Sequence, residues 1–109
     1  MLGALAGAAT VRWLARDRPV VSAARVWAGA PITVRFGDAE AFALVLVAED
    51  GATIATSTID ASDGTARFFT PDPPAPGLYA LTCTPICAGR PCGAPAGIEV
   101  VRTRRVFGA

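Results

Sequence analysis

Three cysteines lie close together near the C-terminal end of this 109-residue chain. Cys83 and Cys87 are separated by three residues, and Cys87 and Cys92 by four. Clustered thiolates bind zinc or an iron–sulfur cluster, but the chain has no histidine and neither spacing is Cys-x-x-Cys, so such a site needs a fourth ligand from elsewhere. We therefore expect no metal cofactor. Two simpler interpretations stay open: a disulfide, with Cys87 and Cys92 as the natural pair, or three reduced thiols.

A second group of oxygen-bearing side chains precedes Gly64. Asp60, Ser62 and Asp63 lie within a few residues, as the ligands of a calcium loop do. The segment lacks the alternating carboxylates and the distal glutamate of an EF-hand loop. A solvated turn is therefore the interpretation that we favour.

The other acidic side chains near turn signals form no pair placed to act as general acid and general base. They are Asp38, Glu40, Glu49 and Asp50. Without histidine, the chain also lacks the usual proton shuttle at neutral pH. We therefore expect a protein that is not an enzyme and that has no catalytic residues, cofactor or small-molecule substrate.

All ten basic residues are arginines, and nine acidic residues nearly cancel them to a formal net charge of +1. That balance gives no electrostatic case for a nucleic-acid partner. The C-terminal end is nevertheless basic, because Arg102, Arg104 and Arg105 precede Phe107. We favour docking of this end onto another protein subunit; a solvated tail and contact with nucleic-acid phosphates are the alternatives.

The N-terminal end is apolar where the C-terminal end is basic. Met1, Leu2 and Leu5, followed by Trp13, are candidates for docking onto a neighbouring subunit. The stretch lacks the positively charged start of a signal peptide, so we do not expect secretion by that route. The longest later apolar run, residues 41–48, falls well short of the ~20 residues of a membrane helix, and we expect no membrane partner.

Short apolar runs between turn signals predict the elements that position these residues. Residues 31–36 alternate between apolar and polar side chains, as a half-buried strand does. Residues 41–48 are apolar throughout and end at Glu49-Asp50-Gly51, which favours a buried central strand and a hairpin over the competing helix. Further strands are predicted over residues 10–14, 20–27, 52–59, 65–70, 78–84 and 98–102. About seven strands at such spacing are typical of a β-sandwich.

The length fits one domain, which we divide into three segments. Residues 1–29 are an N-terminal docking segment with the first strands, residues 30–102 are the sandwich, and residues 103–109 are the basic tail. We expect residues 78–84 and 98–102 to form the last hairpin, across the cysteine-containing loop. Both tryptophans are expected in core packing, with anchoring of an interface as the alternative.

The run Pro76-Gly77-Leu78-Tyr79 resembles the Pro-Gly-x-Tyr start of a late strand in immunoglobulin-like sandwich domains of bacterial surface and phage proteins. The resemblance covers roughly residues 30–102 and implies an all-β, immunoglobulin-like antiparallel β-sandwich. It also implies that Tyr79 turns its hydroxyl back onto nearby backbone, with Gly77 helping to shape the corner. The chain departs from antibody domains, because no cysteine on an early strand is available to pair with Cys83.

The same features, with Gly37-Asp38 ahead of an apolar strand, also look like the small sandwich modules of phage head-decoration, neck, tail and baseplate proteins. By that fold-level analogy we expect a non-enzymatic structural or assembly protein of a virion, whose partners are other protein subunits. The alternative is a secreted or cell-surface binding module that recognises glycan or protein through residues 85–97.

Overall fold

The computed structural model describes residues 18–103, and within this range the chain forms β-strands and no helix. The predicted all-β sandwich is confirmed. Nine strands follow one another along the chain: β1 (Val20–Val21), β2 (Arg25–Trp27), β3 (Pro31–Arg35), β4 (Ala41–Ala48), β5 (Thr53–Asp60), β6 (Thr65–Phe69), β7 (Gly77–Cys87), β8 (Arg90–Pro91) and β9 (Ala96–Arg102).

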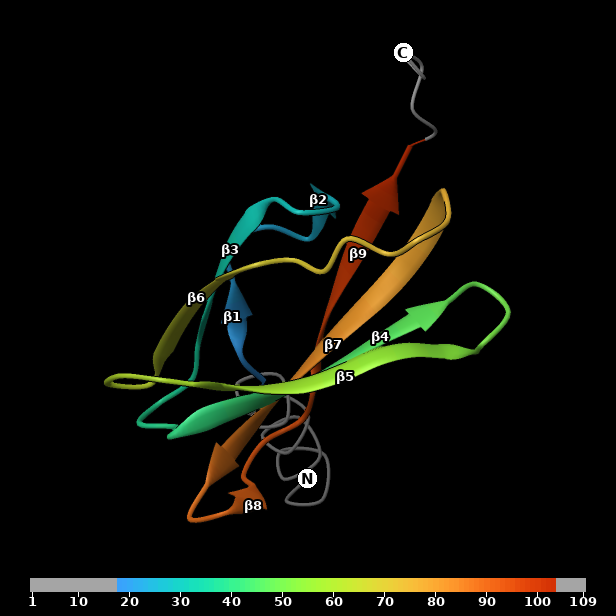
Figure 1. Cartoon of the computed structure of the whole chain (residues 1–109). Helices are drawn as coiled ribbons and strands as arrows, with labels where there is room; N and C mark the ends of the chain where they lie inside the picture. The colour runs from blue at the N-terminus through green and yellow to red at the C-terminus, as the bar shows by residue number, and fades with distance from the viewer. Residues whose placement is uncertain (1–17, 104–109) are drawn as a thin grey trace, which may run out of the picture.

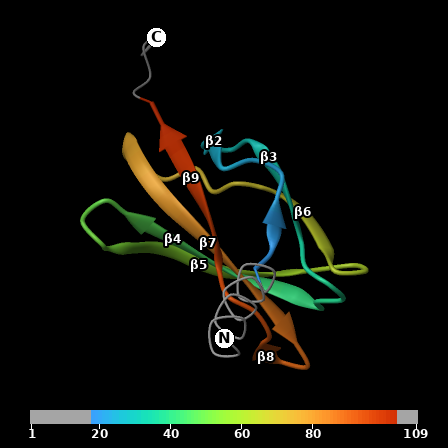
Figure 2. The same ribbon diagram turned by 180° about the vertical axis from the view of Figure 1, so that it is seen from behind.

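The strands form two sheets that pack face to face (Figures 1 and 2). The smaller sheet has the order β1-β3-β6, and its pairs are antiparallel. The larger sheet has the order β2-β9-β7-β4-β5, with the short β8 paired to the end of β7. Its pairs are antiparallel except for β2 and β9, which run parallel.

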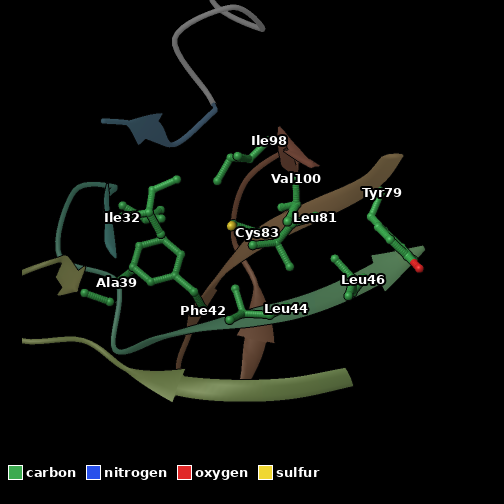
Figure 3. Packing of buried hydrophobic residues seen from close by; sticks show 12 residues of the cluster. Ile32, Ala39, Phe42, Leu44, Leu46, Tyr79, Leu81, Cys83, Ile98 and Val100 are labelled. Carbon is green, nitrogen blue, oxygen red and sulfur yellow. The ribbon is translucent and has the colours of Figure 1, made fainter. Parts of the chain in front are cut away.

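The core lies between the two sheets, where β3, β4, β7 and β9 contribute every second side chain (Figure 3). β4 is apolar at all eight positions, yet Phe42, Leu44 and Leu46 point into the core while the residues between them face the other way. The smaller sheet contributes Ile32 and Val34 in the same alternation. The remaining buried members of the core are Ala39, Ala66, Tyr79, Leu81, Cys83, Ile98 and Val100.

Two turns depend on residues with positive φ. The β4–β5 hairpin turns at Gly51, whose φ is +90°, and the Asp50 carboxylate accepts a 3.0 Å hydrogen bond from the backbone N–H of Ala52. Gly64, with φ of +74°, lies against another loop: a Cβ at this position would overlap the carbonyl oxygen of Gly37. The Gly64 carbonyl accepts a 2.9 Å hydrogen bond from the N–H of Phe36, which holds the two loops together.

The crossing from β6 in one sheet to β7 in the other is fixed by side chains bonded to backbone. The Tyr79 hydroxyl donates a 2.7 Å hydrogen bond to the Ala75 carbonyl, so the tyrosine makes the backbone contact that the resemblance of residues 76–79 implies. At the start of the crossing, the buried Thr70 hydroxyl lies 3.2 Å from the Trp27 carbonyl and 3.1 Å from the Ala30 carbonyl. These contacts tie the crossing to both sheets.

The prediction of one strand over residues 20–27 is wrong. The segment divides at residues 22–24, because its two halves find partners in different sheets: β1 pairs antiparallel with β3, and β2 pairs parallel with β9. The chain passes between the sheets there, held by bonds from the N–H of Ser22 to the Thr33 carbonyl and from the N–H of Glu99 to the Ala24 carbonyl.

The cysteine-containing segment is more regular than predicted. β7 continues to Cys87 and β8 folds back on it, so residues 85–91 form a small hairpin where we expected a loop. The middle strand of the larger sheet is β7, whereas we expected residues 41–48 in that place. β7 can take this place because it is the longest strand, with 11 residues, and it pairs with β4, β8 and β9.

Candidate functional site

Within residues 18–103, no other strand or sheet covers the face of the larger sheet that points away from the core. We call it the outer face. It is formed by the alternate residues that the core does not use, with β4 and β7 in the middle and β5 and β9 beside them. Its central members are Ala43, Val45, Val47, Thr56, Thr58, Ala80, Thr82, Thr84 and Gly97. The smaller sheet packs on the opposite side.

Charge is nearly absent from the centre of the outer face. Arg25 of β2 and Glu99 of β9 are register partners, and their side chains form an ion pair that neutralises both. The neighbouring strands add alanine, valine, threonine and glycine. The cost of removing water from such a surface is low, because it holds few charged groups to desolvate.

A shallow hollow lies in the outer face where β4, β7 and β9 run side by side. Val47, Leu78 and Glu99 are among the residues around it, and the small residues Ala80 and Gly97 contribute to its lining. Its volume is about 480 Å³. An apolar side chain of a partner is the kind of group that suits a hollow with this lining.

Trp27, on the same face, has 63% of its surface exposed. It does not line this hollow but a smaller one, which it forms with Arg25, Val26 and Val101. Its neighbour Val26 packs against the core, so Trp27 points to the outer face, opposite Val101 in the parallel register. The expectation of core packing is wrong for this tryptophan, because its side chain is exposed. The alternative, anchoring of an interface, stays a prediction. The signal available in the sequence was Arg25, since an arginine two residues away on the same strand shares the face of Trp27.

The smaller sheet also exposes one large aromatic side chain. Phe69, at the end of β6, is 76% exposed and lies opposite Pro31 in the register with β3. Arg67 of β6 and Arg35 of β3 are exposed nearby, so this face mixes apolar and positively charged groups. It is therefore less suited than the outer face to close packing against an apolar partner.

The three cysteines that the sequence analysis singled out occupy two different environments. Cys87 and Cys92 form a disulfide that closes the hairpin of β7 and β8. Cys83 is a free thiol in the core, and its burial raises its pKa to about 12. Among residues 18–103 no group of three or more His, Cys, Asp or Glu side chains is placed to hold a metal ion.

Two acidic side chains, Glu40 and Asp72, make contacts that hold parts of the fold together. Glu40 accepts a 3.1 Å hydrogen bond from the N–H of Ala88, a residue with positive φ in the turn before β8. Asp72 forms an ion pair with Arg102, whose Nη1 lies 3.0 Å from the Asp72 Oδ1. Arg102, predicted as a docking residue, thus holds the chain that crosses between the sheets.

The other predicted docking residues lie outside the described range. They are Met1, Leu2, Leu5, Trp13, Arg104, Arg105 and Phe107. The predicted strand over residues 10–14 also lies outside it. In the described part of the chain, no helix is long and apolar enough to cross a membrane.

No protein-family model matches the sequence, and a search of curated proteins finds no match. The function is therefore inferred from the surfaces described above.

Proposed function

We propose that this chain is a non-enzymatic structural protein that docks onto other protein subunits through the outer face of its larger sheet. The observation that carries the proposal is Trp27, a tryptophan with 63% of its surface exposed on a face that also holds a shallow hollow lined by small and apolar residues and by Glu49 and Glu99. Tryptophan is among the residues most enriched at the energetic centres of protein interfaces. The setting that we propose is a phage-type virion assembly.

The composition of β4 supports docking at this face. Strands that are covered on one side only alternate between apolar and polar residues, whereas strands covered on both sides are apolar throughout. β4 is of the second kind, with Ala43, Val45 and Val47 on the outer face. Among residues 18–103, only its inner side is covered by a sheet, so a partner on the outer face would complete the burial that its sequence favours.

The assignment to the immunoglobulin-like family of sandwiches is part of this proposal. Three features support it: the antiparallel β4-β7-β9 arrangement, the parallel pairing of β2 with β9, and the hydrogen bond from Tyr79 to Ala75 at the corner before β7. Such sandwiches serve many functions, so the docking function rests on Trp27 and the outer face and not on the fold.

The test is recovery of partners with the full chain from its native source, followed by mass spectrometry. Trp27→Ala is expected to weaken capture of the partner at least tenfold, because a buried interface tryptophan typically contributes ~2 kcal/mol or more. Phe69→Ala is the matched control, since it removes an exposed aromatic group from the other sheet. A protein that binds no partner, or that loses its partner equally with both variants, contradicts the proposal.

The disulfide favours a second candidate function. Structural disulfides persist in oxidising compartments, so the Cys87–Cys92 bond fits a secreted or cell-surface module that binds glycan or protein through residues 85–97. The exposed Arg90 and Pro91 form β8, the returning strand of this hairpin. Surface labelling of intact cells tests this candidate against the virion setting, because only a cell-surface module would be labelled. Arg90→Ala is the variant that is expected to lose binding of the glycan or protein ligand.

A further inference from the structure

β5 is an unusual edge strand for a soluble sandwich. It ends the larger sheet on one side (Figure 1), pairs only with β4, and exposes Thr53 through Thr58 without interruption. An edge strand presents every second backbone N–H and C=O to solvent, ready to pair with another strand. β5 is eight residues long, which is enough for a full ladder.

The other edges in the described residues are less able to pair. β1 has two residues and β2 has three, while β6 has five and carries the exposed Arg67. Short length and charged side chains are the usual ways in which proteins block edge-to-edge pairing. β5 has neither: from Thr53 to Ile59 it contains no charged residue and no proline.

We propose that β5 is a dimerisation edge, at which two copies of this chain pair through antiparallel β5 strands about a two-fold axis at Ser57. The two larger sheets then become one continuous sheet. This contact uses the edge of the sheet and not its outer face, so it goes beyond the docking function proposed above and stands or falls separately from it.

The register about Ser57 follows from the alternation of side chains. A two-fold axis perpendicular to the sheet must pass midway between a residue and its own copy in the other strand, because otherwise side chains of opposite faces would be paired. With Ser57 on the axis, Thr56 faces Thr58 twice on the outer face, and cross-strand threonine pairs are favourable. Ala55 faces Ile59 twice on the other side, which pairs a small side chain with a large one.

The bulge in β5 also favours this register. The pairing with β4 shifts between Leu46 and Val47, which leaves Ile54 without a partner there. When Ser57 lies opposite its own copy, Ile54 lies at the end of the new strand pairing. When Thr56 lies opposite its own copy, Ile54 and its irregular backbone lie within the pairing. In the register with Ser57 opposite its own copy, the only carboxylate of the strand, Asp60, faces Ile54 and not its own copy, so no like charges meet.

A second copy is the partner that this strand fits best. β5 is self-complementary in size and free of charge repulsion, and a two-fold contact uses the same surface on both subunits and closes without further growth. Pairing also joins the two outer faces side by side into one wide surface of low charge.

The experiment is sedimentation equilibrium of the full, oxidised chain over a wide concentration range. We expect a dimer of twice the 11.1 kDa chain mass. Ser57→Lys puts two like charges together on the axis and is expected to weaken the dimer at least tenfold. Ala80→Lys, a substitution at another exposed position, in the middle of the outer face, is the matched control and is expected to leave the dimer intact.

Cross-linking tests the register independently of stability. Directly opposed residues of antiparallel strands have Cα atoms about 4.5–5.5 Å apart, within the range of a disulfide. Ser57→Cys is expected to form a covalent dimer on mild oxidation, and Ala80→Cys is not. A chain that stays monomeric at every concentration, a dimer lost equally with Ala80→Lys, or cross-linking of Ala80→Cys alone overturns the proposal. If Trp27→Ala loses the partner protein but still forms the dimer, the result bears on the docking function and leaves the dimer proposal standing.

Discussion

The hydroxyl of Tyr79 donates its hydrogen bond to the carbonyl of Ala75, four residues earlier, at a distance of 2.7 Å. The ring is buried in the core, while its polar end reaches the segment that carries the chain from the smaller sheet to the larger one (Figure 3). A single side chain thus links core packing to the path of the crossing.

Removal of this hydroxyl tests how much the corner depends on it. Tyr79→Phe keeps the ring and is expected to lower the free energy of unfolding by about 1 kcal/mol, the usual net value of one hydrogen bond. Tyr79→Leu, which also removes aromatic volume from the core, is expected to cost more. Urea unfolding followed by tryptophan fluorescence measures both. Equal stability of Tyr79→Phe and the native chain would show that water replaces the bond without cost.

Gly64 is expected to be the glycine least tolerant of a side chain among those compared here. Gly64→Ala adds a methyl group that overlaps the Gly37 carbonyl, besides the strain of positive φ, and should cost about 3 kcal/mol or more. Gly29→Ala is the control: φ is +83° but the space is open, so only the backbone strain of about 1 kcal/mol applies. Thermal unfolding of the two variants gives the comparison, and equal losses would contradict the close approach.

The buried Cys83 thiol makes stability depend on pH in the alkaline range. Its pKa is raised by burial to about 12 from an ordinary value of 9.0, so above pH 9 the unfolded chain loses a proton that the folded chain keeps. The unfolded state is thereby favoured as pH rises, and stability is fully retained only below pH 9. From pH 9 to 10 the loss is expected to be about 1 kcal/mol.

Cys83→Ala separates this effect from the titration of other groups. The variant should be less stable at neutral pH, because it leaves a small cavity, but its stability should fall less steeply above pH 9. Denaturant unfolding at several pH values gives both slopes. Parallel slopes for the variant and the native chain would exclude Cys83 as the source.

The Cys87–Cys92 disulfide is expected to stabilise the fold by about 2 kcal/mol, as the chain-entropy estimate gives for a short loop with a sequence separation of 5. The double variant Cys87→Ser with Cys92→Ser should melt at a lower temperature and should not respond to reductant. Cys83→Ala, which keeps the disulfide, should still respond. A reductant effect of equal size in the double variant would point to another cause.

The sequence predicted most strands well, because their signals are local. Alternation placed β3, and the apolar run that stops at Glu49-Asp50-Gly51 placed β4 and its hairpin. The division of residues 20–27 was missed because nothing within that segment shows that β1 belongs to β3 and β2 to β9. The Cα partners of β1 lie 13 and 15 positions further along the chain, and those of β2 lie 74 positions further along it. Pairing at that range depends on the whole fold.

The candidate surfaces were predictable only in part. The sequence marks β4 as apolar on both faces, but it does not show which face lacks a cover. Trp27 looked like a core residue because large apolar residues are usually buried. Arg25 on the same face was the local signal against that, and the parallel register with Val101 places Trp27 on the outer face. The exposed edge of β5 was also hidden, since its place at the end of the sheet follows from the strand order.

The parallel pairing of β2 with β9 bears on how this chain responds to force. β2 lies near the start of the described residues and β9 at their end, so tension applied from both sides slides the two strands lengthwise once the short β1 has detached. In that direction the hydrogen bonds between Arg25–Trp27 and the end of β9 are loaded together and not opened one at a time. A subunit held from both sides can therefore carry tension across its larger sheet without opening it strand by strand.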